Sequence, residues 1–171
     1  FNQILGDTPS NPNSKIDTEY HAMWQEDIND ELLAERLTAN GFEATPILDR
    51  LNAIRHSSRY RHLNNTAHSR LNKLMPYLFA AAADTEDATK TVIRLIDFID
   101  TIIRRSSYLA FLHKKPEALK RLAHIVGNSS WMASYLSRHP ILLDDLLSSQ
   151  LRVKEFDWQA ACKQLENNLN A

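Results

Sequence analysis

The chain has 171 residues, of which 43% are hydrophobic and 24% charged, and its formal net charge is −1 at pH 7. These values are typical of a globular protein of one domain, or of one domain with an extension, and differ from the basic balance of most nucleic-acid-binding domains. The sequence has no apolar run of about 20 residues and no basic-then-apolar N-terminal order, so we expect a cytoplasmic protein without a membrane span.

The N-terminal residues predict a connection to a preceding helix. Phe1 and Leu5 lie four apart, on one helical face, in a pattern that would begin before residue 1. Residues 7–17 are polar and contain two prolines, which is typical of a linker. We therefore expect the chain to be a piece of a longer protein. Its expected parts are a helix tail with a linker (1–17), a central helical domain (18–150) and a C-terminal helix leading towards a downstream domain (151–171).

Two helices are expected in the first third of the central domain. The acidic stretch EDINDE precedes an apolar stripe of Leu32, Leu33 and Leu37, and Gly41 stands at the expected C-terminal cap. Thr45 is the expected N-cap of the next helix, with Pro46 at its first position. The apolar positions of this second helix are Ile47, Leu48, Leu51 and Ile54.

Two longer helices are expected to form the middle of the domain. The stretch 65–83 has a helical apolar period, but Pro76 lies inside it, which predicts a kink or a break. The stretch 85–105 begins with acidic residues and ends with two arginines, as the helix dipole favours. Its broad apolar face predicts a central position in a helical bundle.

Shorter helices are expected towards the C-terminus. They comprise 115–126 capped by Gly127, 129–137 opened by Ser129 or Ser130, 140–147 opened by Pro140, and 157–169. Ser106 and Ser107 are also expected as helix caps, and Ile141, Leu142 and Leu143 as buried positions of the 140–147 helix. No alternating strand pattern occurs, so we predict an all-α fold: an irregular bundle of about seven to eight helices with an N-terminal extension.

Charge is unevenly distributed along the chain. Residues 1–49 contain ten acidic residues against Lys15 and Arg36, whereas residues 50–73 contain six Arg or Lys residues, three histidines and no acid. This basic block, with Tyr60, allows an alternative function as an independent module that binds protein or nucleic acid. The sequence pI of about 6.7 argues against nucleic acid, and we expect the block to pair with the acidic segment or with a protein partner.

The sequence offers weak support for catalytic or metal sites. Successive histidines of the block are six residues apart, which turns them by about 240° on a helix, away from a shared face. We expect them to be exposed or capping. Asp97 and Asp100 share a helical face and could bind a divalent ion, but Arg94 and Arg104 stand at ion-pair spacing from them, and salt bridges are the preferred interpretation.

Cys162 is the single cysteine, which excludes an internal disulfide and a cysteine-based zinc site and suits a reducing cytoplasm. No base lies near it in sequence and it falls on the apolar side of the expected last helix, so we expect a core thiol rather than a nucleophile. The three glycines, Gly6, Gly41 and Gly127, are too dispersed for a phosphate-cradling loop. We therefore assign no catalytic, cofactor-binding or metal-binding residue.

Three motifs resemble a known family. They are LMP at 74–76, RRSSYLAFL at 104–112 and NSSWMASYLSRHPILLDDLL at 128–147. The stretch from about Leu51 to Leu147 is similar to the central helical region of the glutamine synthetase adenylyltransferase family, the bifunctional adenylyltransferase/adenylyl-removing enzymes of bacterial nitrogen regulation.

The resemblance implies a parent enzyme with two nucleotidyltransferase domains joined by this helical region. One domain attaches AMP from ATP to a tyrosine of glutamine synthetase, the other removes it by phosphorolysis, and glutamine and the PII signal protein set the balance. Mg²⁺ and ATP would bind the flanking domains, where the family uses a Gly-Ser turn and an Asp-x-Asp pair. Neither motif occurs in this chain, so the resemblance implies a module that is not catalytic alone.

A coupling module should carry bending points and a docking surface. The helix-breaking chemistry at Pro76 and around 112–116 and 137–140 makes these the expected bending points. The candidate interface residues are Arg104, Arg105, Arg138 and His139, exposed charges within the family motifs. Each has an alternative role in capping a helix end or compensating its dipole.

Overall fold

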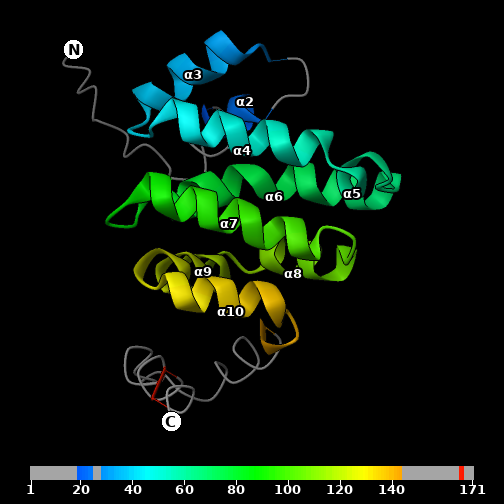
Figure 1. Ribbon diagram of the computed structural model, residues 1–171. Helices are drawn as coiled ribbons and strands as arrows, with labels where there is room; N and C mark the ends of the chain where they lie inside the picture. Colours follow the sequence, from blue (N-terminus) through cyan, green and yellow to red (C-terminus); the bar gives the residue numbers. More distant parts are fainter. Residues whose placement is uncertain (1–18, 25–27, 144–165, 168–171) are drawn as a thin grey trace, which may run out of the picture.

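The computed structural model describes residues 19–24, 28–143 and 166–167. Throughout these ranges the regular secondary structure is helical and no strand occurs, which confirms the all-α prediction. The helices, labelled in Figure 1, are α2 (His21–Met23), α3 (Asp30–Ala39), α4 (Ala44–His56), α5 (Ser58–Arg61), α6 (Asn65–Ala83), α7 (Ala88–Ile102), α8 (Ser106–Lys114), α9 (Pro116–Asn128) and α10 (Ser130–Arg138).

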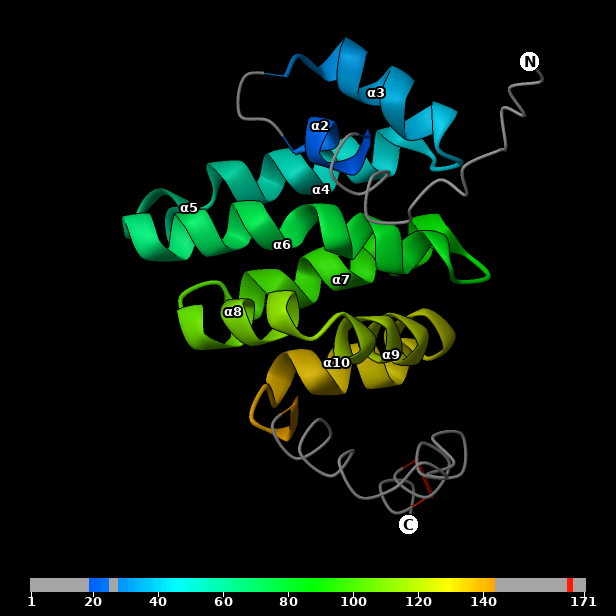
Figure 2. The same ribbon diagram turned by 180° about the vertical axis from the view of Figure 1, so that it is seen from behind.

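The helices stack in successive rows, with α6 and α7 in the middle (Figures 1 and 2). Helix α4 packs against α7 above this pair and α3 packs on α4, while helices α8, α9 and α10 lie below it. Helix α7 contacts α4, α6, α9 and α10, so the expected central position of its apolar stretch is confirmed. Its buried residues Leu95, Phe98 and Ile99 meet Leu78 and Phe79 of α6 in one core cluster.

The sequence predicts a kink or a break at Pro76; helix α6 continues through it, so the break is wrong. A proline removes one backbone hydrogen bond, but helices in proteins owe most of their stability to packing. Pro76 is itself buried, and α2, α7, α8 and α9 all pack along α6. Tertiary contact on several sides therefore keeps the helix in one piece.

Two of the expected helix ends are confirmed. Gly41 has φ of 85° and follows the last residues of α3, and its N–H donates to the Thr38 carbonyl at 3.1 Å. Ser129 is the N-cap of α10, and its hydroxyl accepts from the Met132 N–H at 3.1 Å. Glycine at Gly41 relieves the strain that a side chain meets at positive φ.

Two other helix ends differ from the sequence prediction. Helix α4 begins at Ala44 with Glu43 as its N-cap, so Thr45 and Pro46 lie inside the first turn. The Glu43 side chain makes no capping hydrogen bond. Its backbone N–H instead donates to Thr89 Oγ1 of α7 at 2.9 Å. Ser106 is the first residue of α8 rather than its cap, and its hydroxyl accepts from Arg70 Nη1 at 3.0 Å.

Gly127 does not end α9 but lies inside it, since α9 extends to Asn128. A Cβ added at Gly127 would lie 2.5 Å from Thr91 Oγ1. The glycine therefore permits a close approach of α9 to α7, a role that depends on the tertiary structure.

The expected helix from Pro140 is described only as far as Leu143. Leu143 is 1% exposed, as expected, but Ile141 is 66% exposed, so its expected burial is wrong. Leu32 of α3 is also largely solvent-facing, at 40% exposed, while Leu33 and Leu37 are buried. The expectations for residues 1–17, for Asp144 to Leu147 and for the 157–169 helix with Cys162 fall outside the described residues.

Candidate functional site

The structure brings the four candidate interface residues to one end of the bundle. Arg104 and Arg105 form the turn between α7 and α8, Arg138 is the last residue of α10, and His139 is its C-cap. All four are exposed. Both views place the α7–α8 turn, the end of α10 and α5 at the same end of the molecule, at the right in Figure 1 and at the left in Figure 2.

Helix α5 adds two arginines to this surface, Arg59 and Arg61, which the sequence placed in the basic block and not among the candidate interface residues. We call the set Arg59, Arg61, Arg104, Arg105, Arg138 and His139 the basic end. Sequence spacing alone could not assemble it, because α5, the α7–α8 turn and α10 are far apart in the chain. The sequence did contain one indication of this surface, because basic residues occupy the last turns of both α5 and α10.

Aromatic rings pack beside the basic end. The Arg105 guanidinium carbon lies 5.8 Å from the centre of the Tyr108 ring. Along α10 the rings of Trp131 and Tyr135 stack with centroids 5.0 Å apart, and the Tyr135 ring lies 4.7 Å from that of His139. The rings limit the positions that the charged groups can take, and a guanidinium over an aromatic face is itself favourable.

The opposite end of the molecule is acidic. Glu43 lies on the α3–α4 turn, and Asp84, Glu86 and Asp87 lie on the α6–α7 loop. The Asp87 carboxylate caps α7 by accepting from the Lys90 N–H at 3.0 Å and pairs with the Lys90 ammonium at 3.2 Å. The backbone hydrogen bond, followed by the side-chain contact, holds the pKa of Asp87 below its usual value. The bundle is thus polarised along its helices.

The two aspartates of α7 pair with other helices, so the expected ion pairs within α7 are wrong. Asp97 pairs with Arg50 of α4 at 3.0 Å, and Asp100 pairs with Arg59 of α5 at 3.4 Å. Partial burial raises the pKa of Asp97, although the neighbouring Arg50 opposes this. The basic block therefore contacts α7 at these two positions, and its Asn52 amide donates to Asp30 of α3 at 3.4 Å.

Arg94, the expected partner of Asp97, instead caps α9. Its Nη1 donates to the carbonyls of Val126 and Gly127 at 2.7 and 3.0 Å. These carbonyls lie in the last turn of α9, where backbone acceptors lack helical partners and the helix dipole is negative. Arg94 is therefore a structural cation at the junction of α7 and α9.

Contacts within the fold also engage several groups of the basic block. The Arg55 guanidinium stacks 4.7 Å from the Trp24 ring centre. His56 and His62 bond the carbonyls of Asn52 and Ser58, at 2.7 and 2.8 Å, as expected for capping histidines. These contacts do not favour the alternative nucleic-acid function. Among the described residues, no group of three or more His, Cys, Asp or Glu side chains is placed to hold a metal ion.

The whole chain matches known enzymes. It is 43% identical over 171 residues to the bifunctional glutamine synthetase adenylyltransferase/adenylyl-removing enzyme of Neisseria meningitidis serogroup B. The chain is homologous to a segment of such enzymes. Identity to the enzyme of the same name from Ralstonia nicotianae is 39% over 155 residues, or 88% of this chain, and to that from Chromobacterium violaceum 36% over 144 residues, or 84%.

The chain spans less than a fifth of these adenylyltransferases, 19% of the Neisseria enzyme and 16% of each of the other two. The similarity to these enzymes that the sequence motifs indicated is confirmed, and it extends beyond 51–147 to all 171 residues. No family model and no solved structure matches the chain. Within the described residues, no helix is both long and apolar enough to span a membrane.

Proposed function

We propose that this chain is the non-catalytic helical module that joins the two nucleotidyltransferase domains of an adenylyltransferase/adenylyl-removing enzyme. The observation that carries the proposal is the match along the whole chain to enzymes of which it spans 19%. The lack of a Gly-Ser turn and of an Asp-x-Asp pair supports a module without catalytic residues of its own. Catalysis then belongs to the domains on either side.

The parent enzyme would attach AMP from ATP to a tyrosine of glutamine synthetase and remove it by phosphorolysis. ATP and Mg²⁺ would bind the flanking domains in the cytoplasm, and glutamine and the PII signal protein would regulate the two reactions. The relatives' names, which specify glutamine synthetase as the substrate and both adenylylation and its reversal, support this activity. Regulation by glutamine and PII follows from the resemblance of the sequence motifs.

The basic end is the surface through which the module would dock an acidic face of a partner protein in this assembly. Arg104, Arg105 and Arg138 are exposed, the first two on the α7–α8 turn and the third at the end of α10. Opposite charges across an interface speed association and fix its orientation. The opposite end of the module is acidic, so a charged partner would be attracted to one end and repelled by the other.

Coupling between the flanking domains would use the short joints of the lower helices. Helix α8 ends at Lys114 and α9 begins at Pro116, so Lys115 alone joins them, with φ −123° and ψ 79°. His139 similarly follows α10 with a non-helical backbone. Helix α6 continues through Pro76, so we place the bending at these two joints and not at Pro76. Such bending is allosteric only if an effector binds the two arrangements differently.

Charge reversal at the basic end of the full-length enzyme tests the docking proposal. The variant R104E/R105E/R138E should reduce the response of adenylylation and deadenylylation to glutamine and PII by at least about fivefold, the lower range of allosteric couplings. The control K114E/K120E/R121E reverses three exposed charges elsewhere on α8 and α9. Unchanged responses in the first variant, or equal losses in both, would contradict the proposal.

A further inference from the structure

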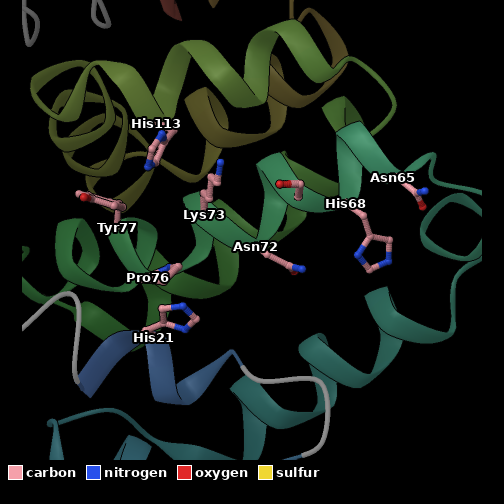
Figure 3. Close-up of a pocket in the computed structure, with 9 residues that line it drawn as sticks. His21, Asn65, His68, Asn72, Lys73, Pro76, Tyr77 and His113 are labelled. Carbon is pink, nitrogen blue, oxygen red and sulfur yellow. The ribbon is translucent and has the colours of Figure 1, made fainter.

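A cavity of about 690 Å³, open to solvent, lies beside α6, between α2 and α8. Figure 3 shows its lining: side chains of α6 form the floor, His21 comes from α2 and His113 from α8. The α6 residues recur at three- and four-residue spacing from Asn65 to Tyr77, which places them on one helical face. This face is polar, whereas the rest of α6 supplies the core through residues such as Leu71 and Leu78.

The cavity is positively charged. Lys73 contributes an ammonium group, three imidazoles line the walls, and none of the described residues that line it carries a carboxylate. Burial lowers the pKa of His113, and the positive charges of Lys73 and Lys114 lower it further. The His113 ring is therefore neutral near pH 7. It lies in the positive electrostatic potential of Lys73 and Lys114, which a bound anion would offset.

Several donors of the cavity are held in place by neighbouring side chains. Trp24 Nε1 donates to Asn72 Oδ1 at 2.7 Å, which leaves the amide nitrogen of Asn72 as its free donor group. The Tyr77 ring packs edge-on against His113, with centroids 5.1 Å apart and an interplanar angle of 86°. Donors from three helices thus surround the cavity before any ligand binds, which lowers the entropic cost of binding.

We propose that this cavity binds a phosphate-bearing small molecule. Lys73 would supply the charge, and His113, His21 and the Asn72 amide would donate to phosphate oxygens. Lysine binds phosphate as a point charge, whereas bidentate recognition of a planar carboxylate favours arginine, which is absent from the lining. The volume lies within the range for small organic ligands, so it leaves room for more than the phosphate group. The site does not depend on the proposed coupling role.

Histidine NMR of the 171-residue chain, titrated with inorganic phosphate and with pyrophosphate at constant ionic strength, tests this site. We expect saturable shifts of the His113 and His21 resonances and a rise in the pKa of His113, because an anion stabilises the imidazolium. His124, which lies outside both the cavity lining and the basic end, should not follow the same curve.

The matched variants are Lys73→Gln and Lys120→Gln, both at exposed lysines and only the first in the cavity. Lys73→Gln should weaken pyrophosphate binding about tenfold, as expected for the loss of a charged hydrogen bond, while Lys120→Gln leaves it unchanged. Three results would overturn the proposal: no saturation, equal shifts at all histidines, or equal weakening by both variants. Malonate binding as tightly as pyrophosphate would overturn the assignment to phosphate.

Discussion

The junction of α7 with α9 and the cavity beside α6 are both polar clusters between a central helix and its neighbours, but they differ in where their polar groups are directed. At the junction, Arg94 donates to two carbonyls of α9, and buried Thr91 bonds the Asp87 carbonyl and Thr85 Oγ1, each at 2.8 Å. In the cavity, Lys73, His21 and His113 line a volume of about 690 Å³.

The difference separates polar groups that stabilise the fold from groups available to a ligand. A buried polar group whose partner is removed loses stability, because its desolvation is no longer offset. A polar group that faces a solvent-filled volume adds little to stability. Substitutions at the junction should therefore unfold the chain more readily, whereas substitutions in the cavity should change binding and titration.

Gly127→Val should give the largest effect. Its Cβ would lie 2.5 Å from Thr91 Oγ1, and Thr91 cannot easily move because its hydroxyl is bonded on two sides. We expect the free energy of unfolding to fall by about 3 kcal/mol, the upper part of the usual range for overpacking. Urea unfolding followed by circular dichroism measures this, and the exposed neighbour offers a control, Asn128→Ala, expected within about 0.5 kcal/mol. A Gly127→Val chain as stable as the parent would show that the junction is not closely packed.

Arg94→Met should have the next largest effect. It keeps most of the apolar side chain but removes two charged hydrogen bonds to the end of α9, which should cost about 2 kcal/mol. The same unfolding assay compares it with Arg104→Met at the exposed basic end, which we expect to change stability by less than about 0.5 kcal/mol. Equal losses in the two variants would remove the distinction between a structural and a surface arginine.

His113 should give the smallest effect, seen only as a dependence on pH. Its pKa in the folded chain lies below the ordinary value of 6.5. The unfolded state therefore binds a proton more readily, and the free energy of unfolding should fall as the pH drops through 6.5. His113→Gln should reduce this slope, measured by urea unfolding across the pH range, while His124→Gln, at an exposed position of α9, serves as the control. A steeper slope in His113→Gln would mean that the cavity favours the charged ring.

The sequence predicted those features that depend on local spacing. The all-α class, the central position of the 85–105 stretch, the left-handed cap at Gly41 and the Ser129 cap all follow from periodicity and helix-end chemistry, and all are found. Local spacing failed where a partner comes from another helix. Asp97 and Asp100 pair with α4 and α5, and Gly127 accommodates Thr91.

The candidate site likewise contains parts that the sequence predicted and parts that depend on contacts between helices. The four interface residues chosen within the motifs lie at one end of the bundle, but α5 joins them only through the tertiary fold. The cavity beside α6 was not predicted, because its polar residues at 65–77 read as the solvent-facing side of an amphipathic helix. Only the positions of α2 and α8 turn that side into a cavity.

The central claim is that this segment couples two reactions without performing either. Replacing residues 19–143 in the full-length enzyme with a flexible Gly/Ser linker tests it most directly, with AMP attachment to and removal from glutamine synthetase assayed separately. The account predicts that both reactions persist while their responses to glutamine and PII fall by at least about fivefold. Loss of either reaction in a variant whose flanking domains still unfold cooperatively, or full retention of both responses, would contradict it.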